Sequence, residues 1–109
     1  HTDAIKENLI PPELSKQQVN LVYASEADLL NMALFGKIPK QWRDENPEDK
    51  GNIRDYANVS QLVCLANLET LNAHFIQHGL EQPERLRILN NTAIQQMRLL
   101  TEDTSKLLK

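Results

Sequence analysis

Two histidines four residues apart are the clearest candidates for chemistry in this sequence. His74 and His78 would share one face of a helix, and two imidazoles at that spacing can hold a zinc ion. The zinc-protease motif also needs a glutamate directly after its first histidine, and Phe75 occupies that position. No third ligand is evident, and histidines near the C-terminal end of a helix also interact favourably with the helix dipole. We therefore predict no metal site.

Nucleophilic and phosphate chemistry lack the residues that they require. The single cysteine, Cys64, lies among apolar residues, a setting that raises the pKa of a thiol and favours a structural role. The three glycines are isolated from one another, so no glycine-rich phosphate loop exists. Carboxylates crowd residues 44–49, where they indicate a solvated loop. We predict that the chain is not an enzyme, has no catalytic residues and binds no cofactor.

Length and composition indicate one globular domain over residues 1–109. Apolar residues make up 40% of the 109 residues and charged residues 25%, so the chain is neither disordered nor fibrous by composition. Its 12 Lys and Arg against 15 Asp and Glu argue against a strongly basic nucleic-acid-binding domain. One cysteine excludes an internal disulfide, and no apolar run approaches the roughly 18 residues of a membrane span. We predict a cytoplasmic protein that does not enter a membrane.

The positions of proline and glycine predict an all-α fold. Prolines stand at or just before stretches with helical periodicity, and Gly36 and Gly79 close apolar stretches, as residues that end helices do. No alternating β-branched run or hairpin signal appears. We expect a compact bundle of four to five helices in which the helix over 59–78, apolar almost all round, is the buried centre. The expected elements are a short helix over 2–9, one or two helices over 16–35, a short turn of helix over 39–45, the central helix over 59–78 and a long last helix over 83–108.

The last helix carries an apolar stripe spaced by threes and fours, close to a coiled-coil seam. At 1.5 Å per residue its roughly 26 residues reach about 39 Å, longer than a domain of this size is wide. Two interpretations follow: a helix packed along its own bundle, or a homodimer through this helix. The candidate interface residues are Leu86, Leu89, Ala93, Met97 and Leu100.

Residues 28–46 resemble a helix-turn-helix, because an apolar helix is followed by a glycine turn and a short polar helix. Basic side chains there could meet phosphates and a glutamine could reach a base edge. The acidic residues that follow would repel a phosphate backbone, and the alternative is an ordinary helical hairpin with Trp42 folded onto the core. The candidate DNA contacts are Lys37, Lys40, Gln41, Arg43 and Arg54.

Three blocks of the sequence resemble the C-terminal region of KilA-N domain proteins, a family of phage and bacterial proteins. They are HTDAIKENLIPPELSKQQVNLVYASEADLLNMALFG, KQWRDENPEDKGNIRDYANVSQLV and ERLRILNNTAIQQM, and together they span nearly the whole chain. A similar block occurs in RhuM-type virulence proteins. The chain departs from the family pattern at Ile38-Pro39, where the family favours a Thr-Ala pair.

This resemblance implies an accessory domain whose parent protein binds DNA through a separate N-terminal KilA-N domain. The KilA-N domain itself is expected to be absent from residues 1–109. The family brings no established catalytic residues, so the expected role is oligomerisation or protein interaction that positions the linked DNA-binding domain. Direct DNA binding through residues 28–46 is the alternative.

Overall fold

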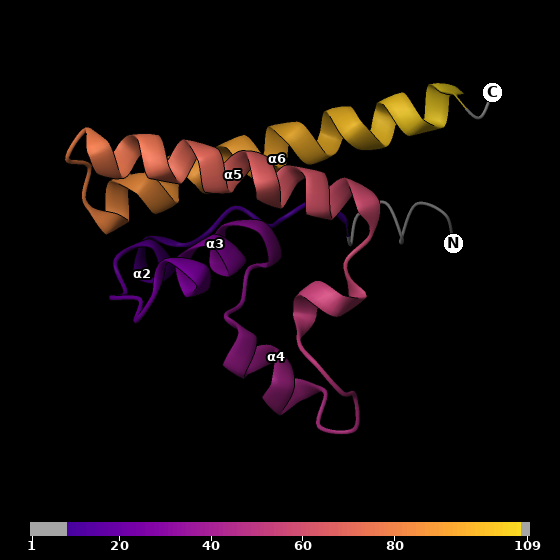
Figure 1. Cartoon of the computed structure of the whole chain (residues 1–109), viewed down its shortest axis with the longest axis horizontal. Coiled ribbons are helices and arrows are strands. Elements are labelled where there is room, and N and C mark those ends of the chain that lie inside the picture. Colours follow the sequence, from indigo (N-terminus) through magenta and orange to yellow (C-terminus); the bar gives the residue numbers. More distant parts are fainter. Residues whose placement is uncertain (1–8, 108–109) are drawn as a thin grey trace.

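The computed structural model describes residues 9–107, with side chains from residue 9 to residue 101, and every regular element in that part is a helix. Two long helices, α5 (Val59–Gln77) and α6 (Gln82–Leu107), form an antiparallel hairpin, and α3 (Glu26–Phe35) packs against both (Figure 1). The short helix α2 (Lys16–Val19) lies against α6. The predicted all-α bundle with a long C-terminal helix is confirmed.

A small lobe projects from this bundle between α3 and α5. It consists of residues 37–58 and contains α4 (Pro39–Glu45) and the 3-10 helix η1 (Ile53–Tyr56), which pack against each other (Figure 1). Gly36 ends α3 with a φ of 74°, a left-handed conformation that favours glycine, and so turns the chain into the lobe. None of the helices in the described part is long and apolar enough to cross a membrane.

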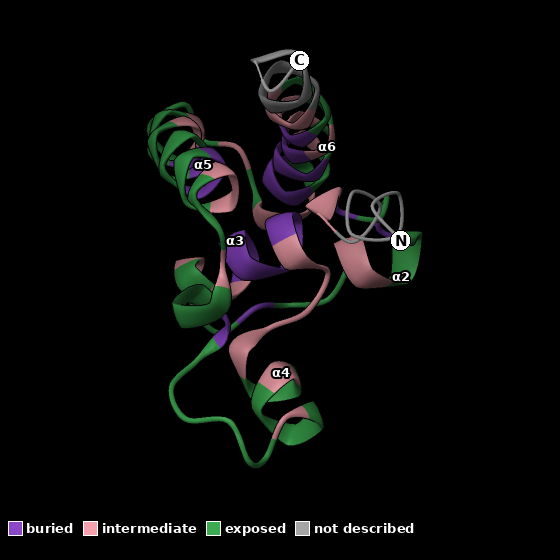
Figure 2. Ribbon diagram, turned by 90° about the vertical axis from the view of Figure 1, so that its right-hand side faces the viewer, coloured by how far each residue is buried: buried purple, intermediate pink, exposed green. Residues whose placement is uncertain are grey.

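The buried centre of the fold is α3, and the prediction that the helix over 59–78 fills this place is wrong. Six consecutive residues of α3, from Leu29 to Leu34, are buried. In contrast α5 buries only the side that faces α3 and α6, and its outer side is exposed (Figure 2). The apolar composition of α5 therefore reflects a second surface that faces solvent and does not indicate complete burial.

Residues 16–35 form two helices, and capping side chains fix where each begins. The hydroxyl of Ser15 accepts from the backbone N–H of Gln18, and the Gln18 side chain accepts from the Ser15 N–H in return. The hydroxyl of Ser25 likewise accepts from the Asp28 N–H at 3.1 Å. The helix predicted over residues 2–9 lies, apart from its last residue, outside the described residues.

A segment without regular structure, residues 10–14, crosses the bundle and is held by one amide side chain. We call it the strap. Asn90, which is buried, donates through Nδ2 to the carbonyls of Pro12 and Ala33, both at 3.0 Å. Its Oδ1 accepts from the backbone N–H of Leu14, also at 3.0 Å. This single side chain therefore satisfies three backbone groups and ties the strap to both α3 and α6.

Replacing Asn90 by alanine is expected to lower the free energy of unfolding by about 2–4 kcal/mol, because each buried backbone group left without a partner costs about 1–3 kcal/mol. Urea unfolding followed by circular dichroism measures the change. The exposed neighbour Asn91 provides the matched control, and N91A should stay within about 0.5 kcal/mol of the wild type. Equal stability of N90A and N91A would contradict the role given to this amide.

Candidate functional site

The apolar stripe of α6 that predicts a dimer lies inside the chain's own core. Leu86, Leu89, Ala93 and Met97 are all 0% exposed, and Leu100 packs partly buried against the same core. The prediction that these residues form an interface with a second copy is therefore wrong. The physical reason is that α3 and α5 both pack on this side of α6 and cover the stripe within one chain.

The five residues predicted to contact DNA lie in or beside the lobe, and two of the cations among them are paired. Lys37 Nζ lies 2.5 Å from Glu45 Oε1. Arg54 Nη2 lies 3.6 Å from Glu69 Oε1 on α5. A DNA phosphate would have to displace Glu45 from Lys37 and Glu69 from Arg54, so neither cation is free to bind it.

Two other side chains of the lobe are engaged within the lobe itself. The Gln41 side chain accepts from the Ile38 N–H at 2.9 Å, so it caps the start of α4. The Trp42 and Tyr56 rings pack with centroids 5.2 Å apart, which joins α4 to η1 and keeps Trp42 out of the main core. Only Lys40 and Arg43 among the predicted DNA contacts are exposed with no partner in the described part of the chain.

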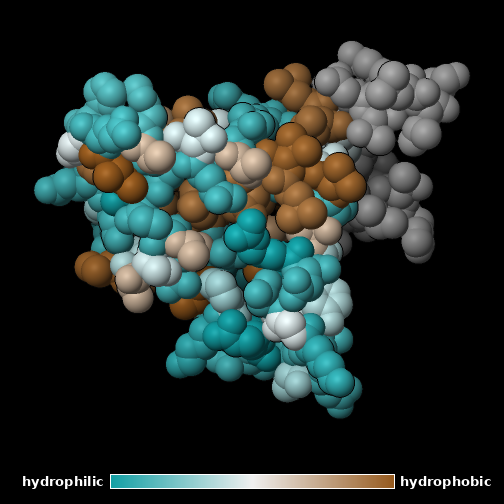
Figure 3. Space-filling view, viewed as in Figure 1, coloured by the Kyte–Doolittle hydropathy of each residue, from teal (hydrophilic) through white to brown (hydrophobic). Residues whose placement is uncertain are grey.

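The most extensive group of exposed apolar side chains lies on α5 and the adjoining part of α6. Half of the eight large apolar side chains that are exposed in the described part belong to α5. Ile76 lies in the last turn of α5, and the other three lie in its first half. Figure 3 shows apolar atoms gathered over that first half and the neighbouring stretch of α6. A hydrogen bond from Asn67 to Gln96, at 3.1 Å, joins the two helices next to this group. We call the group the α5 patch, and it consists of Val59, Leu62, Val63 and Leu99.

The outer face of α5 is also nearly free of charge, which is unusual for an exposed helix. Glu69 is the one formally charged residue among the 19 of α5, and Arg54 pairs with it. Along the exposed side beyond the patch, the small residues Ala66, Thr70 and Ala73 leave room for another backbone to approach. Exposed helices ordinarily carry charged residues on the solvent side. A partly apolar face of this length with one charged residue is typical of a contact surface.

The hollow between the lobe and the bundle offers little for catalysis. It encloses about 280 Å³ and is lined mainly by apolar and aromatic residues, among them Phe35, Trp42 and Tyr56. Lys37 also lines the hollow, but its ammonium group is paired with Glu45. Within residues 9–101, no group of three or more His, Cys, Asp or Glu side chains is arranged to hold a metal ion.

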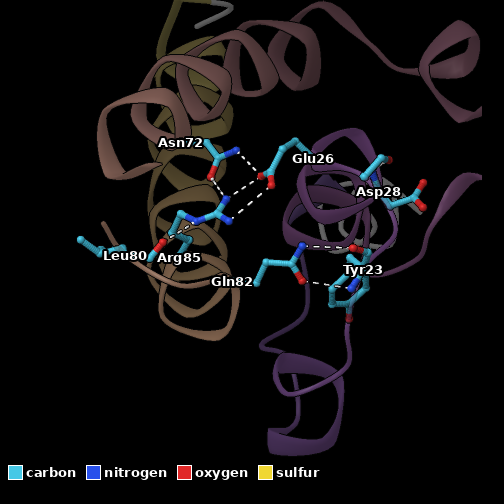
Figure 4. A network of polar contacts seen from close by, with 8 residues as sticks. Tyr23, Glu26, Asp28, Asn72, Leu80, Gln82 and Arg85 are labelled. Atoms are coloured by element: carbon cyan, nitrogen blue, oxygen red, sulfur yellow. Dashed lines mark hydrogen bonds and ion pairs between the residues drawn. The ribbon is translucent and has the colours of Figure 1, made fainter. Parts of the chain in front are cut away.

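One buried cation, which the sequence analysis did not find, connects the three main helices. Arg85 is 6% exposed, and its guanidinium donates to Glu26, to Asn72 Oδ1 at 2.8 Å and to the Leu80 carbonyl at 2.9 Å (Figure 4). Asn72 Nδ2 also donates to the Glu26 carboxylate at 2.8 Å. Every polar side-chain atom of the network has a hydrogen-bond partner, which is typical of a structural role.

Comparison of the chain with protein-family models finds no match. No curated protein and no solved structure matches it either. The assignment to the C-terminal region of KilA-N proteins stays a prediction that rests on the three sequence blocks.

The ion pair of Glu26 should make stability depend on pH. The hydrogen bond from Arg85 lowers the pKa of the Glu26 carboxyl, and partial burial opposes this only in part. Because the folded pKa is the lower one, the stabilisation is complete above the unfolded value of about 4.3 and is lost as pH falls through the folded pKa. Urea unfolding of Glu26→Gln should show a loss of about 1–3 kcal/mol at pH 7, shrinking toward pH 3. The exposed Glu84→Gln is the control, and a pH-independent loss in E26Q would contradict the ion-pair account.

The thiol of Cys64 should be unreactive in the folded chain. It is fully buried, and burial raises its pKa to about 11. At pH 8 the folded protein should therefore hold roughly a hundredfold less thiolate than the unfolded chain, and burial further blocks access. Labelling with a thiol reagent should be at least that much slower in buffer than in urea. Rapid labelling of the folded protein would show that Cys64 is accessible.

Proposed function

We propose that this chain is a helical protein-interaction domain that self-associates through the outer face of α5. The observation that carries the proposal is that face itself, which is exposed and apolar at one end and has one formal charge in 19 residues. Catalysis has no comparable support, because the buried charge of Arg85 serves packing and the thiol of Cys64 is enclosed.

A second copy of the chain is the partner that this face suits best. In a two-fold dimer each copy presents the same surface, so a charged face would meet its own charges and repel itself. The outer face of α5 reduces this repulsion, since its one carboxylate is paired with Arg54. The small residues in its middle would let two α5 helices approach closely, with the α5 patches covered at both ends of the contact.

The biological setting that we propose follows from the sequence resemblance. In a cytoplasmic KilA-N type protein, a self-associating C-terminal domain would hold two linked DNA-binding domains together. The second domain would then bind at a high effective concentration once the first is engaged. The accessory role thus needs no catalytic group and no cofactor in this chain.

Direct DNA binding, the alternative from the sequence, has weaker support. The carboxylates paired with Lys37 and Arg54 and the acidic residues that follow α4 both oppose contact with phosphates. Duplex binding at low salt that weakens steeply as salt rises would support this alternative.

Sedimentation velocity at micromolar to about 100 micromolar concentration tests self-association. The wild type should form a dimer, and Val63→Glu should weaken it about tenfold or more, because the new carboxylate would lose water on burial. Val63 is 44% exposed, so the variant should fold, which circular dichroism checks.

The matched control is Val22→Glu, at a residue 93% exposed and remote from α5 in the sequence, which should dimerise like the wild type. A wild type that stays monomeric throughout, or equal behaviour of V63E and V22E, would refute the proposed interface.

A further inference from the structure

The opposite end of α5 brings two imidazoles together on the surface. His74 lies in the last turn of the helix and His78 follows as its C-cap residue. Both are exposed, and their ring centroids are 4.1 Å apart. Within residues 9–101 no carboxylate forms an ion pair with either ring. The spacing predicts the shared face, and the structure adds that the two rings are in fact adjacent.

The hydrogen bond of the His78 ring determines which of its two nitrogens has a lone pair free to bind a metal ion. Nδ1 lies 2.9 Å from the backbone carbonyl oxygen of His74. A carbonyl oxygen only accepts, so Nδ1 carries the hydrogen, and in the neutral ring the lone pair is then on Nε2. Histidines that bind metals commonly donate their other ring N–H to a carbonyl in this manner, which fixes the tautomer and the orientation of the ring.

We propose that His74 and His78 chelate a divalent transition-metal ion such as Zn²⁺. Neutral imidazole nitrogen is a preferred ligand of these metals, and residues four apart on a helix can hold one ion between them. The described residues supply no third protein ligand, so the remaining positions are open to water or to a donor from another molecule. The site lies at the opposite end of α5 from the α5 patch and does not depend on the proposed self-association.

Calorimetric titration of the full chain with zinc chloride tests this site. The wild type should bind one ion per chain, and His74→Gln and His78→Gln should each weaken binding by about tenfold or more, a loss that removal of even an outer-shell partner can cause. The matched control is His1→Gln, which replaces the third histidine of the chain and should leave this site intact. Zinc binding that survives in both H74Q and H78Q, or that disappears in H1Q, would overturn the proposal.

Histidine side-chain nitrogen shifts, recorded by NMR, provide a second readout that does not depend on affinity. Before zinc is added, the neutral His78 ring should show the tautomer with hydrogen on Nδ1. Zinc should then shift the Nε2 resonance of His78 and one ring nitrogen of His74 in the same titration. Unchanged shifts of both rings at saturating zinc would exclude the site, even if the ion binds elsewhere on the chain.

Discussion

The complete burial of α3 is the constraint from which the rest of the structure follows. A helix with six consecutive buried residues cannot be covered by one neighbour, because successive side chains point around the whole helix axis. Here α5 and α6 both pack on α3, and the strap is tied to its last turn through Asn90. Covering α3 takes up the apolar stripe of α6, and it leaves the outer face of α5 as the most extensive uncovered apolar surface in the described part of the chain.

Polar contacts determine how α3 sits among its neighbours. Near the start of α3, Glu26 meets the guanidinium of Arg85 on α6 and the amide of Asn72 on α5. Near the end, the carbonyl of Ala33 accepts from Asn90, which lies five residues after Arg85 on α6. Apolar contacts alone tolerate sliding, whereas two directional contacts at opposite ends of α3 hold it in one register against α6.

Local signals in the sequence predicted the elements well, because capping and helix termination depend on neighbouring residues. Gly36 ends α3 as predicted, and the local positions of Ser15 and Ser25 explain where α2 and α3 begin. The sequence does not predict which element covers each apolar face, because helical periodicity indicates that a face is covered but not which helix covers it. For this reason the periodicity of α6 is equally consistent with cover by a second copy, whereas in the structure α3 and α5 cover its apolar stripe. The Arg85 network joins residues up to 59 positions apart, and no spacing rule connects them.

The long sequence separation between α3 and its contacts on α6 affects how the protein folds during synthesis. The strap is fixed by a residue 76 positions further along the chain than Leu14, and Arg85 also comes late. While residues 1–80 are being synthesised, α3 therefore lacks both α6 and the amide that ties down the strap. The side of α3 that packs on α6 remains uncovered until α6 emerges, and in this interval the nascent chain is more exposed to aggregation.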